Sequence, residues 1–188
     1  MNALKALGDP VASILALEEV KAHLRVPHGE EDGLIAGYIE ASAAFIEDFT
    51  GRALIERSYR LILDRWPEGP VRFPKPPLIA VDQVAIFDMD GTSTIVSPSD
   101  YRVETRAEPG FLLPVGLRHL PQPGLMPSGI EIDFRAGYGR DWNAIPAPIR
   151  HAALMLVADL HGSRGSEGGI SSRRIQALLL PFRIMGLS

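Results

Sequence analysis

Residues 17–54, LEEVKAHLRVPHGEEDGLIAGYIEASAAFIEDFTGRAL, decide the fold of this chain. Leu17, Val20 and Leu24 recur at helical spacing, and Pro27 ends this first helix because proline removes a backbone donor. A second apolar stripe follows with the same period: Leu34, Ile35, Tyr38, Ile39, Ser42, Phe45, Ile46 and Phe49. Gly51 supplies the left-handed residue that ends many helices. The stretch therefore predicts an amphipathic helical hairpin.

The composition predicts a soluble globular protein with one core of ordinary size. The chain has 188 residues, of which 46% are hydrophobic. No apolar run reaches the roughly 18 residues of a membrane span, and the N-terminus lacks the basic flank and apolar core of a signal peptide. We therefore expect neither a membrane segment nor export. Cysteine is absent, which excludes disulfides and cysteine-ligated zinc.

Charge is distributed unevenly along the chain. Residues 1–50 carry nine acidic and three basic side chains, whereas residues 162–188 carry four arginines and one glutamate. An acidic head argues against a broad nucleic-acid-binding surface. A basic tail favours contact with an acidic surface.

The periodicity changes after Leu54 from helical to alternating, which predicts a β region. We expect strands at residues 59–64, 71–73, 81–87, 93–96, 101–104, 110–113 and 130–135. Asp90-Gly91 is a strong signal for a hairpin turn. The proline-rich stretches 74–77 and 121–127 predict extended loops, because proline cannot donate to a sheet ladder.

A third helix and an apolar tail end the sequence. Pro146 and Pro148 can open a helix, since the first turn does not need their missing amide protons. The predicted buried stripe of this helix is Ile149, Ala152, Ala153, Leu156, Val157 and Leu160. Residues 162–169 are typical of a linker, and residues 171–185 form an amphipathic segment too short for a core of its own. This tail either folds back on its own domain or docks on a partner, and the sequence leaves both open.

One stretch indicates an enzyme. Residues 84–92, VAIFDMDGT, resemble the first motif of the haloacid dehalogenase superfamily, in which Asp88 would accept a phosphoryl group and Asp90 would act as acid and base beside magnesium. That chemistry needs a later lysine and further acidic residues, but no lysine follows Asp88. An Asp-Gly hairpin explains the same residues without chemistry. We therefore predict that the protein is not an enzyme, with this phosphohydrolase as the alternative.

The other candidate chemical sites are weaker. The five histidines are not spaced as metal ligands, and no Gly-x-Ser-x-Gly or Ser-x-x-Lys motif occurs. Gly137 and Gly139 resemble half of a phosphate loop but lack the Lys-Ser/Thr pair that a nucleotide site requires. We predict no metal, no cofactor and no catalytic residues.

An ordered series of short motifs gives the clearest functional signal. The motifs are LEEVKAHLRV at 17–26, FIEDFTGRAL at 45–54, PKPPL at 74–78, SDYRV at 99–103, FRAGYG at 134–139, IPAPIR at 145–150 and LLLPFR at 178–183. Together they resemble the head-tail connector, or adaptor, family of tailed bacteriophages, prophages and gene transfer agents. Residues before Leu17 lie outside the resemblance, and we expect an irregular arm there.

The resemblance implies an α+β fold. A single connector domain, residues 1–161, would contain helices at 17–50 and 147–161 and an antiparallel β insertion at 54–140. Residues 162–188 would form a linker and a C-terminal tail that docks on the capsid portal. The portal-docking residues would be Arg173, Arg174, Ile175, Leu178, Leu179, Phe182 and Arg183.

The implied function is structural. Copies of the chain would form a ring, twelvefold in symmetry, that joins the portal to a tail-side connector or stopper protein in the virion neck. The protein would be made in the host bacterial cytoplasm, and DNA would pass through the ring without specific binding. Because acidic groups repel phosphate, Glu40, Glu47 and Asp48 would let DNA slide if they face this channel.

Overall fold

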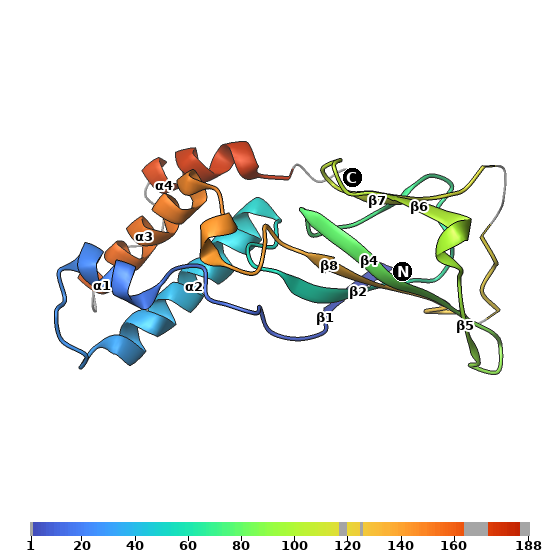
Figure 1. The fold of residues 1–188 in the computed structure, drawn as a ribbon, viewed down its shortest axis with the longest axis horizontal. Coiled ribbons are helices and arrows are strands. Elements are labelled where there is room, and N and C mark those ends of the chain that lie inside the picture. The colour runs from blue at the N-terminus through green and yellow to red at the C-terminus, as the bar shows by residue number, and fades with distance from the viewer. Residues whose placement is uncertain (1, 117–119, 125, 164–172, 185–188) are drawn as a thin grey trace. The chain divides into compact units, whose positions relative to one another are not determined.

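The chain divides into two units in a computed structural model (Figure 1). The structure describes residues 2–116, 120–124, 126–163 and 173–184. One unit, called here the β unit, consists of residues 1–9 and 56–137. The other, the helical unit, consists of residues 10–55 and 138–188. Residues 56–137 are therefore inserted into the sequence of the helical unit, and residues 1–9 add an N-terminal segment to the β unit.

Two segments that are far apart in the sequence build the helical unit. The first contains α1 (Leu17–Leu24) and α2 (Asp32–Thr50); the second contains η2 (Trp142–Ala144), α3 (Ala147–Gly162), α4 (Arg173–Leu179) and η3 (Leu180–Phe182). Helix α3 contacts α1, α2 and α4. The shared core includes Val20, Ile35, Ile39, Ile46, Ile149, Leu156, Ile175 and Leu179. This core therefore needs both segments.

The predicted helical hairpin is confirmed, with one change on its apolar stripe. Lys21 Nζ lies 2.8 Å from Asp32 Oδ1, which ties α1 to the start of α2. Hydrogen bonding to Asp32 raises the pKa of Lys21. Leu34 is 44% exposed, so its assignment to the buried stripe is wrong. The next residue, Ile35, is fully buried, so Leu34 lies about 100° away around the helix, at the edge of the stripe.

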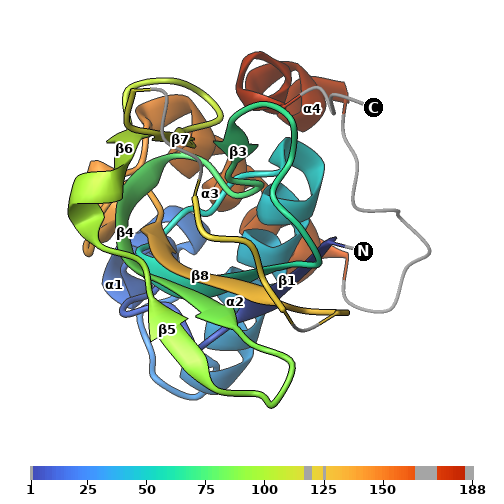
Figure 2. The same cartoon turned by 90° about the vertical axis from the view of Figure 1, so that its right-hand side faces the viewer.

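The β unit contains two antiparallel sheets (Figures 1 and 2). The larger sheet has the strand order β1 (Asn2–Ala6), β2 (Arg57–Leu63), β8 (Ile130–Ala136), β4 (Leu78–Phe87) and β5 (Ser93–Ile95). The smaller sheet has the order β3 (Val71–Arg72), β7 (Phe111–Pro114) and β6 (Tyr101–Glu104), and η1 (Pro98–Asp100) leads into β6. Together with the helices, these sheets confirm the predicted α+β class.

One face of the larger sheet is apolar and packs against the smaller sheet. Its buried side chains on β2 and β8 alternate along each strand: Tyr59, Leu61, Leu63, Ile130, Ile132 and Phe134. The Phe134 ring centre lies 5.5 Å from that of Tyr59 and 4.8 Å from that of Phe73, which follows β3. This aromatic contact joins the two sheets.

The opposite face of the larger sheet carries paired charges. Arg60 on β2 lies 2.6 Å from Asp133 and 2.7 Å from Glu131, both on β8. Arg135 on β8 lies 3.1 Å from Asp82 on β4. The hydrogen bonds that both arginines donate to neighbouring carboxylates raise the pKa of each arginine. These cross-strand pairs support the strand register on this face.

The seven predicted strands are confirmed, with their ends shifted by at most three residues. The structure adds an eighth, β1, which pairs with β2 from Asn2↔Leu63 to Ala6↔Tyr59. The expectation of an irregular arm is wrong for these residues, because the edge of β2 imposes the strand and the local sequence does not. The proline-rich stretches 74–77 and 121–127 have no strand in their described residues, as predicted.

The boundary between a connector domain at 1–161 and a tail at 162–188 stays a prediction. The described residues of that tail, 162–163 and 173–184, belong to the helical unit. Most of the predicted linker, residues 164–169, lies outside the described residues. Among the helices that the structure describes, none combines the length and apolar character needed to cross a lipid bilayer.

Candidate interaction site

The C-terminal segment, residues 173–184, packs on the helical unit. Helix α4 contacts α2 and α3, and Ile175 and Leu179 are fully buried in the helical core. Leu178 and Phe182 are half-buried against the same core. Of the two arrangements that the sequence left open, the structure shows this segment folded back on its own unit.

Two hydrogen bonds anchor the end of this segment to the C-terminal end of α2. Arg52 Nε donates to the carbonyl oxygen of Phe182 at 2.6 Å. The Ile184 amide donates to the carbonyl oxygen of Thr50 at 2.8 Å. Arg52 is only 6% exposed, so this hydrogen bond is shielded from water. Loss of the Arg52 side chain would leave the Phe182 carbonyl oxygen without its donor.

The sequence Thr50-Gly51-Arg52 builds this anchor. Thr50 Oγ1 donates to the carbonyl oxygen of Ile46 at 2.6 Å, and Gly51 ends α2 with a φ of 74°. A Cβ on Gly51 would lie 3.6 Å from the Ile184 Cβ, which is an ordinary contact. The left-handed backbone angle, and not a lack of space, therefore favours glycine here.

The seven predicted docking residues differ in exposure. Arg173, Arg174 and Arg183 are exposed, Leu178 and Phe182 are half-buried, and Ile175 and Leu179 are buried. The Arg183 guanidinium carbon lies 5.5 Å from the centre of the Phe49 ring, a cation–π distance. Their assignment to portal docking stays a prediction.

Two residues of this site were not among the predicted docking residues. Leu180 is 60% exposed, because it lies in η3, after the apolar stripe of α4 has ended. The sequence feature that could have indicated this exposure is Pro181, the next residue, because it interrupts the helical period. Arg52 was part of a quoted motif, but its bond to Phe182 joins distant parts of the chain and leaves no periodic pattern.

The three acidic residues of α2 that were expected near the solvent are not equivalent. Glu40 and Asp48 are exposed. Glu47 is half-buried, and its Oε1 accepts a hydrogen bond from the Leu54 amide at 2.9 Å. Glu47 therefore fixes the chain as it leaves α2.

Asp88 and Asp90, the residues of the phosphohydrolase alternative, lie in the hairpin between β4 and β5. Asp90 Oδ1 accepts a hydrogen bond from the Thr92 amide at 3.0 Å, and Gly91 has a φ of 81°. The bond from Thr92 lowers the pKa of Asp90. Strand β5 follows the turn directly, so the motif forms the predicted hairpin. In the described ranges, no three acidic or histidine side chains are grouped closely enough to hold a metal ion.

Comparisons with known proteins agree on one family. Residues 14–103 match the family model of the phage gp6-like head-tail connector protein. The fold is similar to a chain in the virion of a native gene transfer agent particle, at 27% identity and a TM-score of 0.83, with 98% of this chain and 97% of that chain covered. No curated protein matches the chain in sequence.

Two further solved structures are of the particle neck. In the neck of the empty particle, computed with C6 symmetry, the similar chain is 27% identical with a TM-score of 0.84. In the neck of the native particle, computed with C12 symmetry, it is 25% identical with a TM-score of 0.79. Both matches cover 99% of this chain and 97% of the other.

The fold and these matches define a structural virion adaptor. The match to the phage gp6-like head-tail connector family, together with the similarity to gene transfer agent proteins, confirms the resemblance that the motifs predicted. The family match runs from the start of the helical unit into β6, and the structural matches extend it through α3 and the C-terminal segment.

Proposed function

We propose that this chain forms the adaptor ring in the neck of a virion or virus-like particle. The observation that carries the proposal is the similarity, over at least 97% of both chains, to proteins of gene transfer agent particles. A ring of twelve copies satisfies both the C12 and the C6 symmetry of the two neck structures. The ring joins the capsid portal to a tail-side connector or stopper protein and encloses the DNA passage. The protein is made in the host bacterial cytoplasm.

The ring acts without catalysis and without specific DNA binding. In support, Asp90 is used in a hairpin turn and the family is structural. Glu40 and Asp48 are exposed and would repel DNA phosphates if α2 lines the passage. If neutral variants at both positions retained packaged DNA and ejected it as the parent does, this repulsion would play no part.

The C-terminal segment docks on the portal through its exposed side. The exposed residues of the segment include Arg173, Arg174, Arg183 and the apolar Leu180. The buried and half-buried docking residues act indirectly, because they hold the segment on the helical core. The matching portal surface is therefore acidic with an apolar spot. Each contact is weak, but simultaneous contacts around a ring make the attachment durable.

A charge reversal on this surface tests the docking role. Removing the whole segment would also remove Ile175 and Leu179 from the core, so point variants are the sharper test. In the variant Arg173→Glu/Arg174→Glu, we expect portal binding to fall at least tenfold while the fold is retained. The matched control is Arg102→Glu/Arg106→Glu, which makes the same charge change at exposed positions of the β unit.

The measurement is binding to the portal protein encoded in the same gene cluster, followed by electron microscopy of the complexes. A parent chain that adds a ring to the portal supports the adaptor function. Equal binding by the variant and its control would remove the C-terminal segment from the portal contact. A parent chain that adds no ring would overturn the adaptor function, and magnesium-dependent phosphatase activity lost in Asp88→Asn would support the alternative.

A further inference from the structure

The β4–β5 hairpin presents an apolar side chain that portal docking does not explain. Met89, at its tip, is 85% exposed, the largest value among the exposed large apolar side chains of the described residues. Asp88 and Asp90 flank it and are also exposed. Ile95, on β5, is 53% exposed. The hairpin therefore combines an apolar tip with two negative charges.

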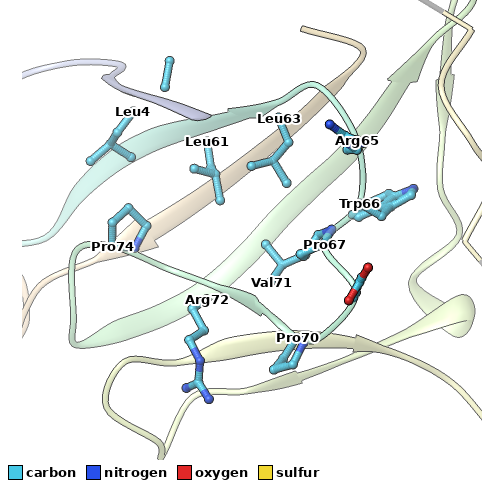
Figure 3. A pocket seen from close by; sticks show the side chains of 12 residues that line it. Leu4, Leu61, Leu63, Arg65, Trp66, Pro67, Pro70, Val71, Arg72 and Pro74 are labelled. Carbon is cyan, nitrogen blue, oxygen red and sulfur yellow. The ribbon is translucent and has the colours of Figure 1, made fainter. Parts of the chain in front are cut away.

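A groove of about 660 Å³ lies in the same β unit, beside β1 and β2 (Figure 3). Its apolar lining includes Leu4, Leu61, Leu63, Val71, the Trp66 ring and the prolines 67, 70 and 74. Leu4 is 37% exposed at its mouth. The Trp66 indole nitrogen donates to the Pro121 carbonyl oxygen at 2.8 Å, which holds the ring in place.

The charges around the groove are opposite to those of the hairpin. Arg65 and Arg72 line it and are exposed, and Glu68 is the one acidic residue among the lining residues. The lining is therefore net positive, whereas the hairpin tip is negative. An apolar side chain between two aspartates is complementary to an apolar groove with two arginines.

The hairpin and the groove lie at opposite edges of one sheet. Strands β1 and β5 are the outermost strands in its order. The hairpin is level with the end of the groove near Leu63 and Trp66, because Leu63 and Ile86 both pair with Ile130 and the two strands run in the same direction. Two different surfaces at opposite edges make a head-to-tail contact, and such contacts form a ring if the rotation closes.

We propose that the hairpin of one copy inserts into the groove of the next copy around the ring. Met89 enters the apolar groove beside Trp66, and Asp88 meets the arginines that line it. A rotation about an axis roughly parallel to the strands brings the two surfaces together without a shift along that axis. A closed ring needs this condition, whereas a shift would give a helical filament. The inference rests on the proposed ring function and names the contact between its subunits.

Cysteine cross-linking tests this contact directly, because the natural chain has no cysteine. The double variant Arg65→Cys/Met89→Cys should give, after mild oxidation of portal-bound rings, a ladder of covalent multimers. A disulfide within one chain would give no multimers, so a ladder reports contacts between copies. A mixture of the two single-cysteine variants should stop at dimers, and each single variant alone should stay uncross-linked.

Side-chain changes at the hairpin tip give a second test. Met89→Asp should lower the yield of rings at least tenfold, and Met89→Leu, which keeps the apolar character, should leave it unchanged. Asp88→Arg should lower ring yield by a similar factor, and adding Arg65→Asp or Arg72→Asp should restore it. Circular dichroism of each variant should match the parent, since these side chains are exposed in the single chain.

The outcomes separate this contact from the adaptor function. Rings that form on the portal without the Arg65–Met89 ladder would overturn the contact and leave the adaptor function intact. A ladder together with loss of rings in Met89→Asp supports both. A parent chain that forms no ring in any condition would overturn both.

Discussion

The helical unit is built from two separate stretches of the sequence, whereas most of the β unit comes from one continuous stretch. The helical core combines residues near both ends of the chain, such as Ile35 from α2 with Ile175 from α4. The β unit is one continuous insert, residues 56–137, with the short strand β1 added at its edge. The helical unit therefore depends on its last twelve described residues, while the β unit has most of its contacts within a single stretch.

The two tryptophans make this comparison measurable, because there is one in each unit. Trp66 lies in the β unit, and Trp142 lies in the helical unit, where the Arg150 guanidinium carbon is 4.3 Å from its ring centre. The variants Trp142→Phe and Trp66→Phe each retain one fluorescent reporter. Unfolding in urea can then be followed for each unit separately.

The largest expected effect is in the β unit. Phe134→Ala removes a fully buried ring that contacts Tyr59 and Phe73, so the free energy of unfolding of this unit should fall by about 3–5 kcal/mol. The Trp66 signal should shift to lower urea, and the Trp142 signal should shift much less. Equal shifts of both reporters would mean that the two units unfold as one.

The next largest effect is in the helical unit. Leu179→Ala leaves a cavity at a fully buried position, and the helical unit should lose about 3 kcal/mol. Leu180→Ala is the matched control, because Leu180 is 60% exposed and its loss should change stability by less than about 0.5 kcal/mol. In this case Trp142 should report the change. If Leu179→Ala were as mild as its control, the C-terminal segment would not be part of the helical core.

A smaller effect is expected at the anchor. Arg52→Ala leaves the Phe182 carbonyl oxygen without its 2.6 Å donor, which should cost about 1–3 kcal/mol. Hydrogen exchange at the Ile184 amide, which is bonded to Thr50, should become faster. The exposed Arg102→Ala should change neither quantity. Unchanged exchange at Ile184 would show that apolar packing alone holds the segment.

The smallest effect is on the charged face of the β unit. Arg135 is 38% exposed and lies 3.1 Å from Asp82, so solvent screens the pair. Arg135→Gln should reduce the stability of the β unit by about 0.2–1 kcal/mol at low salt and by less in 1 M salt. A larger loss that persists in high salt would mean that the aliphatic part of this side chain contributes through packing.

The helices and central strands follow from local patterns, but their long-range connections do not. The period of α2 and the Asp90-Gly91 turn are written in adjacent residues, and both were predicted. Strand β1 has no such pattern, because Asn2–Ala6 becomes a strand only through pairing with β2. The Arg52 anchor and the place of α4 depend in the same way on partners far along the chain. Sequence could name the apolar tail but could not decide what its side chains contact.

The ends of the inserted segment lie side by side, and this has a consequence for how such proteins diversify. Arg57 pairs with Ala136 at the start of the insert, and the Tyr138 amide donates to the Leu54 carbonyl oxygen at 3.2 Å just outside it. A short loop could therefore reconnect the helical unit if the insert were excised. Evolution could exchange or lengthen this module as a cassette, and a designer could graft a different domain at the same point.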